Sequence, residues 1–299
     1  MKVLVTGATG LIGRHTVDAL QQKGHTVRTF QRAALDGLET VQGDIRTDRD
    51  ALCRAASDCE AIVHLAGRGD VGESRRDPVG YAELNATGTL HALDAARASG
   101  AVFVLASTQR VYPLQPEPCR EDQPLAPDSP YGYAKWVAEL WCRMASEHFF
   151  VRARVLRLFS VYGPGQQANG GSGVVSIFAR AALAGEPLVV QSAGRRDFTD
   201  ARDVARGIVR AVEDARSGGG YRIYNVATGT GTSFTELAQT IVRLSGSRSE
   251  IREEISEPSG CDLVADTRCG ARDLGYTATI PLEEGLEHYL QWLNTRNSC

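Results

Sequence analysis

The chain has 299 residues, of which 42% are hydrophobic and 23% are charged, and its formal net charge is −3. This balance excludes an intrinsically disordered chain, and the small net charge argues against a general nucleic-acid-binding protein. The length is enough for one large α/β domain or for two smaller lobes.

A glycine-rich segment follows the first predicted strand. Lys2 to Thr6 is short and apolar, as expected of a strand buried on both faces of a parallel sheet. Gly7 allows a tight turn, Gly10 lets backbone N–H groups approach a pyrophosphate, and Gly13 lets a helix pack on the strand. This pattern predicts a dinucleotide cradle, although a βα turn without a ligand is the alternative. The expected cofactor contacts are Gly7, Thr9, Gly10, Leu11, Ile12 and Gly13.

The second predicted strand, Thr26 to Phe30, ends beside Gln31 and Arg32. Dinucleotide-binding βαβ folds that bind NAD carry Asp or Glu near the end of the second strand, where the carboxylate binds the ribose 2′-hydroxyl. In those that bind NADP, an arginine nearby accommodates the 2′-phosphate. Arg32 therefore favours NADP, with Gln31 beside it. NAD stays possible if Arg32 is an ordinary solvated loop arginine.

Strands and helices then alternate. A strand at Glu39 to Gln42 leads into Asp44, and a further strand runs from Ala61 to Ala66. The alternation predicts a parallel sheet with right-handed crossovers. Asp44 either accepts a hydrogen bond from an adenine amino group or only fixes a turn. His64, inside an apolar strand, is interpreted as a hydrogen-bonded core histidine.

The following segments reach the edge of the sheet where ligands bind. The polar loop at 67–78 follows the carboxyl end of a central strand, the usual ligand position in open α/β sheets. A helix is expected from Val79 to Ser99. The next strand, Ala101 to Ala106, ends in Ser107 and Thr108, so two hydroxyls reach the same edge.

The predicted helix from Tyr131 to His148 begins with a possible acid–base pair. Residues four apart share a helix face, so Tyr131 and Lys135 lie side by side. A neighbouring ammonium favours a phenolate, so we expect Lys135 to lower the pKa of Tyr131. Tyr131 could then exchange a proton with a carbinol or carbonyl oxygen while Thr108 donates a hydrogen bond to that oxygen. Tyr133 is a competing phenol, but it has no lysine four residues later.

These segments together resemble the extended short-chain dehydrogenases/reductases, the branch of nucleotide-sugar epimerases, dehydratases and reductases. The resemblance covers nearly the whole chain and implies that Thr108, Tyr131 and Lys135 are catalytic. The matching motifs are Thr6-Gly7-Ala8-Thr9-Gly10-Leu11-Ile12-Gly13, Gly43-Asp44-Ile45, His64-Leu65-Ala66-Gly67, Asn85-Ala86-Thr87-Gly88-Thr89 and Ala106-Ser107-Thr108-Gln109-Arg110-Val111-Tyr112. The further cofactor contacts that it implies are Asp44, Ile45, Leu65, Ala66, Gly67, Ser107, Tyr131 and Lys135.

The second half of the chain extends the resemblance. A strand at Val155 to Phe159 leads into Ser160, and Arg196 occupies the position where the family's arginine usually meets the substrate diphosphate. Arginine suits a phosphate because its donors form a fixed fork. The alternative is a surface arginine in a loop. Thr108, Ser160 and Arg196 are therefore the expected substrate contacts.

These observations predict an α/β fold, a doubly wound parallel sheet of the Rossmann type with a smaller C-terminal substrate lobe. Residues 1–165 are expected to form the NAD(P)-binding domain, with 196–229 returning to it. Residues 166–195 and 230–299 are expected to form the substrate lobe, and the substrate is expected to lie between the two.

Departures from the family pattern narrow the expected reaction. Gln109 and Arg110 replace the Asp-Glu pair of sugar 4,6-dehydratases, and Ser160 replaces an asparagine that contacts substrate in many relatives. Residues 258–262 lack the arginine often placed there for a second phosphate contact. Because Arg32 favours NADP, the leading hypothesis is NADPH-dependent reduction of a nucleotide-linked 4-keto sugar. The alternatives are an NAD-dependent C4 epimerase, a reductase of a non-sugar carbonyl and a non-catalytic redox sensor.

The helix from Tyr131 also suggests a homodimer. Its apolar stripe is Val137, Leu140, Trp141 and Met144. This is more apolar surface than one sheet face needs, although an intramolecular core is the alternative. The resemblance implies a two-fold four-helix interface with the helix through Leu90 and Leu93.

The seven cysteines include no Cys-x-x-Cys pair. Their odd number and scattered positions argue for reduced thiols and against a disulfide framework or a zinc site. The N-terminal residues form a core strand, and no apolar run is long enough to span a bilayer. We therefore expect a cytoplasmic protein with no metal, no membrane partner and no nucleic-acid partner.

Overall fold

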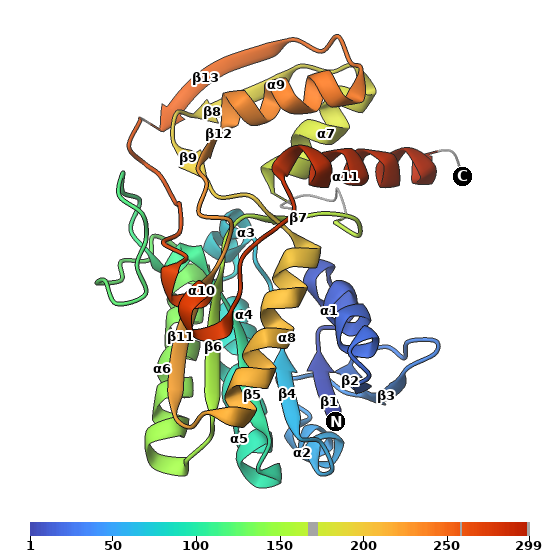
Figure 1. The fold of residues 1–299 in the computed structure, drawn as a ribbon, viewed down its shortest axis with the longest axis vertical. Helices are drawn as coiled ribbons and strands as arrows, with labels where there is room; N and C mark the ends of the chain where they lie inside the picture. Colours follow the sequence, from blue (N-terminus) through green and yellow to red (C-terminus); the bar gives the residue numbers. More distant parts are fainter. Residues whose placement is uncertain (167–172, 258, 298–299) are drawn as a thin grey trace.

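The computed structural model describes residues 1–166, 173–257 and 259–297. In these residues seven parallel strands form one sheet in the order β11-β6-β5-β4-β1-β2-β3 (Figure 1). The strands are β1 (Lys2–Thr6), β2 (Thr26–Gln31), β3 (Glu39–Gln42), β4 (Ala61–His64), β5 (Val102–Thr108), β6 (Ala153–Leu158) and β11 (Tyr221–Val226). The predicted doubly wound parallel sheet is confirmed.

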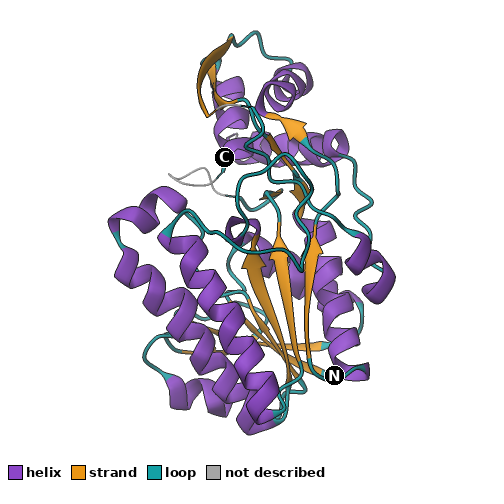
Figure 2. Ribbon diagram, turned by 90° about the vertical axis from the view of Figure 1, so that its left-hand side faces the viewer, coloured by secondary structure: helices purple, strands orange, loops and turns teal. Residues whose placement is uncertain are grey.

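Helices cover both faces of the sheet, as Figure 2 shows. Alternate side chains of one strand point to opposite faces, so Val3 and Val5 join one core while Leu4 joins the other. The first face packs against α1 (Leu11–Gln22) and α8 (Ala201–Ser217). The second face packs against α2 (Arg49–Ala56), α5 (Gly88–Ser99) and α6 (Pro130–Phe149).

A smaller lobe with its own hydrophobic core lies above the sheet in Figure 1. It contains α7 (Val174–Ala184), β8 (Leu188–Ser192), α9 (Phe234–Ser245), β13 (Ile251–Glu257) and α11 (Leu282–Asn297). The sequence did not predict β13. This strand pairs only with β8 and is largely exposed, so it lacks the apolar run that marks the strands of the central sheet.

Short strand pairs lie where the chain passes between the sheet and the lobe. They are β7 (Val161–Tyr162) with β10 (Thr199–Asp200), and β9 (Arg195–Arg196) with β12 (Thr232–Ser233). The buried carboxylate of Asp197 accepts hydrogen bonds from the backbone N–H groups of Thr228 (2.9 Å) and Gly229 (2.8 Å). These bonds fix the chain on either side of the junction. Helix α10 (Arg268–Leu274) packs nearby against β11 and α8.

The segment after β4 differs from the expectation. The predicted helix begins at Pro78 and contains α4 (Pro78–Ala82), a π-helical turn, η1 (Glu83–Thr87), and then α5. The Asp77 carboxylate caps its start by accepting from Gly80 N (3.0 Å), and proline suits the first helical position. The loop expected at 67–78 contains a further short helix, α3 (Val71–Arg76), capped by Asp70.

The described residues contain no helix that is both long enough and apolar enough to cross a bilayer.

Candidate active site

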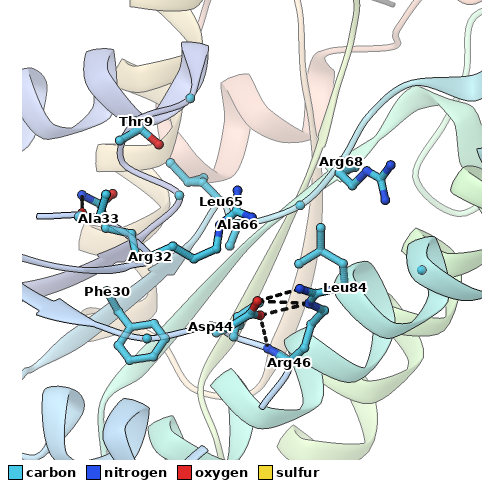
Figure 3. Close-up of a pocket in the computed structure, with 17 residues that line it drawn as sticks. Thr9, Phe30, Arg32, Ala33, Asp44, Arg46, Leu65, Ala66, Arg68 and Leu84 are labelled. Carbon is cyan, nitrogen blue, oxygen red and sulfur yellow. Dashed lines mark hydrogen bonds and ion pairs between the residues drawn. The ribbon is translucent and has the colours of Figure 1, made fainter. Parts of the chain in front are cut away.

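A pocket of about 540 Å³ opens at the carboxyl ends of β1, β2 and β4 (Figure 3). A volume of this size is typical of small-molecule and cofactor sites. The predicted cofactor residues that line it are Gly7, Thr9, Gly10, Gln31, Arg32, Asp44, Ile45, Leu65, Ala66 and Gly67. Leu11, Ile12 and Gly13 form the first turn of α1, directly after this lining.

The glycine-rich turn has the geometry of a phosphate cradle. Gly7 has a φ of +73°, and a Cβ added to it would lie 2.6 Å from Ala66 N. A Cβ on Gly13 would collide with the carbonyl oxygen of Gly7. Gly10 caps α1 without a side-chain hydrogen bond, so the N–H groups of the first turn stay available to an anion. The turn therefore fits the pyrophosphate of a dinucleotide.

The opposite end of the pocket is strongly charged. Arg46 donates to the Asp44 carboxylate from its backbone N (2.9 Å) and from Nη2 (2.7 Å), and this guanidinium lowers the pKa of Asp44 to about 2. Arg32 is exposed at the end of β2, and Arg68 lies on the far side of the pocket, as Figure 3 shows. Asp44 therefore stays ionised and is held in place by Arg46, whose part the sequence did not predict.

The π-helical turn η1 holds the loop that forms the pocket floor. The Asn85 side chain is buried, and it accepts from Arg68 N and donates to Arg68 O, both at 3.1 Å. A Cβ on Gly67 would lie 2.5 Å from Asn85 Oδ1 and 3.3 Å from Lys135 Nζ. π-Helical turns often occur at functional sites, and this one brings an amide against the loop beside the expected catalytic lysine.

Tyr131 and Lys135 lie beside the loop that contains Gly67 and Gly69, and Thr108 is hydrogen-bonded to Tyr131, but none of the three is among the residues that line the pocket. β5 ends at Thr108, and Ser129 caps α6 by accepting from Gly132 N (3.3 Å), which places Tyr131 and Lys135 in the first turns of the helix. Burial raises the pKa of Tyr131, while its hydrogen bond with Thr108 acts in the opposite direction.

One expectation about this group is wrong. Lys135 was expected to lower the pKa of Tyr131, but the groups that oppose the effect of burial on this phenol are Thr108 and Arg110. Lys135 Nζ instead donates to Ala106 O at 2.8 Å, and burial lowers the pKa of Lys135 to about 8. Tyr133, the competing phenol, is 53% exposed and packs against Trp136.

A buried ion pair supports the catalytic strand and helix. Arg157 Nη2 donates to Glu139 Oε2 at 2.7 Å, and both side chains are at most 3% exposed. Ser107, expected as a cofactor contact, donates its hydroxyl to Glu139 Oε1 at 2.5 Å. Arg157 also donates to the Tyr112 hydroxyl (2.8 Å), which donates to Asn225 Oδ1 (2.7 Å). The sequence signals for this network were an arginine in an apolar strand and a glutamate one turn after Lys135.

The expected substrate residues come from two places. Ser160 follows β6, and Gln109 Nε2 donates to its hydroxyl oxygen at 3.0 Å. Arg196 is buried in β9, where its Nη1 donates to Cys261 O (2.7 Å) and its guanidinium lies 5.2 Å from the centre of the Phe234 ring. Thr108 and Ser160 thus belong to neighbouring strand ends, while Arg196 comes from the junction with the small lobe.

Comparisons with known proteins agree with this geometry. Residues 3–227 match the family described as the NAD dependent epimerase/dehydratase family. The chain is 34% identical to the UDP-glucose 4-epimerase of Mycolicibacterium smegmatis, covering 99% of this chain and 100% of that protein.

Two solved structures are similar to this chain over nearly the full length of both proteins. A Thermotoga maritima UDP-glucose 4-epimerase with UDP-glucose has a TM-score of 0.90 and 28% identity, covering 99% of this chain and 100% of that one. The UDP-glucuronic acid 4-epimerase of Bacillus cereus, in complex with UDP-glucuronic acid and NAD, has a TM-score of 0.88, 26% identity and the same coverage. The resemblance inferred from the sequence motifs is confirmed.

Gly67→Ala tests the packing of the pocket floor. The added Cβ would displace Asn85 or Lys135, so we expect NAD affinity to fall by at least about tenfold, equivalent to about 1.4 kcal/mol. Isothermal titration calorimetry gives the affinity, and chemical denaturation checks that the variant folds. Gly219→Ala is the control, because a Cβ there meets no atom within 4 Å. Unchanged NAD affinity in Gly67→Ala would contradict this description of the floor.

Proposed function

Because the chain belongs to the NAD-dependent epimerase/dehydratase family, we propose that it is an NAD-dependent C4 epimerase of a nucleoside-diphosphate hexose. The observation that carries this proposal is one half-buried proton-transfer phenol, Tyr131, which is hydrogen-bonded to Thr108. The two residues after Thr108 are the neutral Gln109 and the cationic Arg110. Removing and returning a hydride at one carbon needs one such group, whereas elimination of water needs a further acid and base.

The chain's own residues divide the work. The glycine turn and the N-terminus of α1 hold the pyrophosphate of NAD. When bound, NAD supplies the acceptor that takes a hydride from the sugar and gives it back. Tyr131 takes the proton of the sugar hydroxyl and later returns it, and Thr108 donates a hydrogen bond to the same oxygen.

The remaining groups set charge and position. Lys135 adds a positive charge one helical turn after Tyr131, and Ala106 O accepts a hydrogen bond from its ammonium. Arg196 is assigned to the substrate diphosphate, since a guanidinium matches phosphate oxygens in pairs. The sugar itself would then lie between the sheet and the small lobe, near Ser160.

NADPH-dependent reduction of a 4-keto sugar is the second candidate. It was the leading hypothesis from the sequence, and the exposed guanidinium of Arg32 in the cofactor pocket still favours it. The relatives that act as C4 epimerases, one of them solved with NAD, give more support to epimerisation. A non-catalytic redox sensor has less support, because the homologues are enzymes.

We also propose that the protein is a homodimer. Val79, Tyr133 and Leu140, on α4 and α6, are 67%, 53% and 46% exposed. α5 and α6, both labelled in Figure 1, pack against each other, so a second copy could add its own pair and form a four-helix interface.

Replacing Tyr131 with Phe tests the proposed catalytic role. The ring keeps its packing while the proton relay is lost, so we expect epimerisation of UDP-glucose to slow by about 10²–10⁴-fold with NAD affinity little changed. Tyr133→Phe is the matched control and should keep full activity. Equal turnover by Tyr131→Phe and the unmodified protein would refute the assignment.

Glu139→Gln tests the electrostatic support of Lys135. Burial lowers the pKa of Lys135, while Cys142 and then the Glu139 carboxylate act in the opposite direction, so removing the charge of Glu139 should lower that pKa further. If turnover needs protonated Lys135, the alkaline limb of the pH–rate profile moves to lower pH. Glu147→Gln, exposed on the same helix, is the control. An unmoved alkaline limb in Glu139→Gln would contradict the account.

His64 and Cys142, the other titratable groups that interact with Lys135, should not contribute to the alkaline limb of the pH–rate profile. Burial lowers the pKa of His64 to about 3 and raises the pKa of the Cys142 thiol well above its ordinary value, so both stay neutral near pH 8. Removing one partner of a buried ion pair lowers the free energy of unfolding by about 3–5 kcal/mol. The rates are therefore measured well below the unfolding temperature of the variant.

Arg32→Ala tests the second candidate. We expect NADP affinity to fall by at least about tenfold while NAD affinity changes by less than about twofold, because only NADP carries the 2′-phosphate. Calorimetry with both cofactors measures this, with Arg49→Ala on the exposed surface of α2 as the control. If the unmodified protein binds both cofactors equally, Arg32 does not recognise the phosphate.

Light scattering at micromolar concentration tests the dimer, and we expect twice the mass of the chain. Leu140→Lys should give the monomer, because a charge on the apolar face opposes its burial. Ile177→Lys, at an exposed position on α7, is the control and should stay dimeric. A monomeric mass for the unmodified protein would rule the proposal out.

A further inference from the structure

Gln109 holds an unusual position directly after Thr108. It opens the short 3₁₀ turn η2 (Gln109–Val111) and is 7% exposed. Its Nε2 donates to Ser160 Oγ at 3.0 Å, while its Oε1 is buried and has no hydrogen-bond partner in the part of the chain that the structure describes. Thr108 pairs with Leu158 in the sheet, so this amide joins the ends of β5 and β6.

The unpaired oxygen indicates a ligand with a proton to give. Buried acceptors are seldom left without a donor, because they have lost the hydrogen bonds of water. Ser160 Oγ already accepts from Gln109 and therefore keeps its own proton to donate. The pair thus offers one acceptor and one donor beside each other, and a hydroxyl group, which both donates and accepts, matches it.

We propose that Gln109 and Ser160 bind a sugar hydroxyl that flanks the reacting carbon. This inference rests on the proposed function, which places C4 of the sugar at Thr108 and Tyr131. The Gln109 amide, which Ser160 holds between the ends of β5 and β6, would then meet a hydroxyl next to C4, either the one on C3 or the one on C6. Gln109 is accordingly a specificity-determining residue for fully hydroxylated hexoses.

Substrates lacking one hydroxyl test the inference. The unmodified protein and Gln109→Leu are each given UDP-glucose, its 3-deoxy analogue and its 6-deoxy analogue, and kcat/KM is measured. We expect the unmodified protein to lose at least about tenfold on one analogue, and this analogue identifies the hydroxyl. The kcat/KM of Gln109→Leu on UDP-glucose should be lower than that of the unmodified protein by a similar factor. This variant should have the same kcat/KM on UDP-glucose and on that analogue. If C6 is the contact, UDP-glucuronic acid is also a poor substrate, because its carboxylate has no proton to donate.

Two further variants keep the result interpretable. Gln191→Leu, at an exposed position on β8, is the matched control and should keep the preference of the unmodified protein. Ser160→Ala removes the donor of the pair and also the hydroxyl that holds the Gln109 amide, so it should weaken the preference even if Gln109→Leu folds poorly.

Calorimetric affinities for the same nucleotide sugars separate this inference from the proposed function. If no variant epimerises UDP-glucose but the affinities follow the expected pattern, the proposed function fails and the hydroxyl site stands. If Gln109→Leu keeps the affinity and kcat/KM ratios of the unmodified protein, the hydroxyl site is wrong.

Discussion

The ion pair between Glu139 and Arg157 is the contact on which the site depends. Both side chains are almost fully buried, so each charge is compensated mainly by the other and by the hydrogen bonds around them. Ser107 donates to Glu139 and is the chain neighbour of Thr108, while Lys135 lies one helical turn before Glu139. The pair therefore fixes α6 against β5 and β6 beside Thr108, Tyr131 and Lys135, the residues proposed to transfer the proton.

The cofactor pocket depends on a second set of constraints, which are steric. A Cβ added to Gly7 would lie 2.6 Å from Ala66 N, and a Cβ added to Gly67 would displace the side chain of Asn85. This close packing brings the glycine turn before α1 and the loop at Ala66 and Gly67 together in the lining of the pocket. A rigid floor of this kind suits a cofactor that stays bound through a whole catalytic cycle.

The sequence predicted what depends on local pattern. The alternation of apolar strands and helices predicted the parallel sheet, and the glycine spacing predicted the tight turn before α1. It did not predict the contacts between distant residues: Glu139 and Arg157 are brought together only by the packing of α6 on β6, and the π-helical turn around Asn85 leaves no periodic signal. The prediction that Lys135 lowers the pKa of Tyr131 was wrong. Helical spacing places the two side chains on one face, but it does not set the direction of the ammonium, which donates to Ala106 O.

The account's central claim is that a hydride leaves C4 of the sugar and returns to the same carbon. The most direct test is UDP-glucose carrying deuterium at C4, incubated with the purified protein without added cofactor and followed by NMR. The account predicts UDP-galactose with the deuterium retained at C4 and no net consumption of cofactor. Failure to form the C4 epimer, together with stoichiometric oxidation of added NADPH by a 4-keto nucleotide sugar, would contradict it.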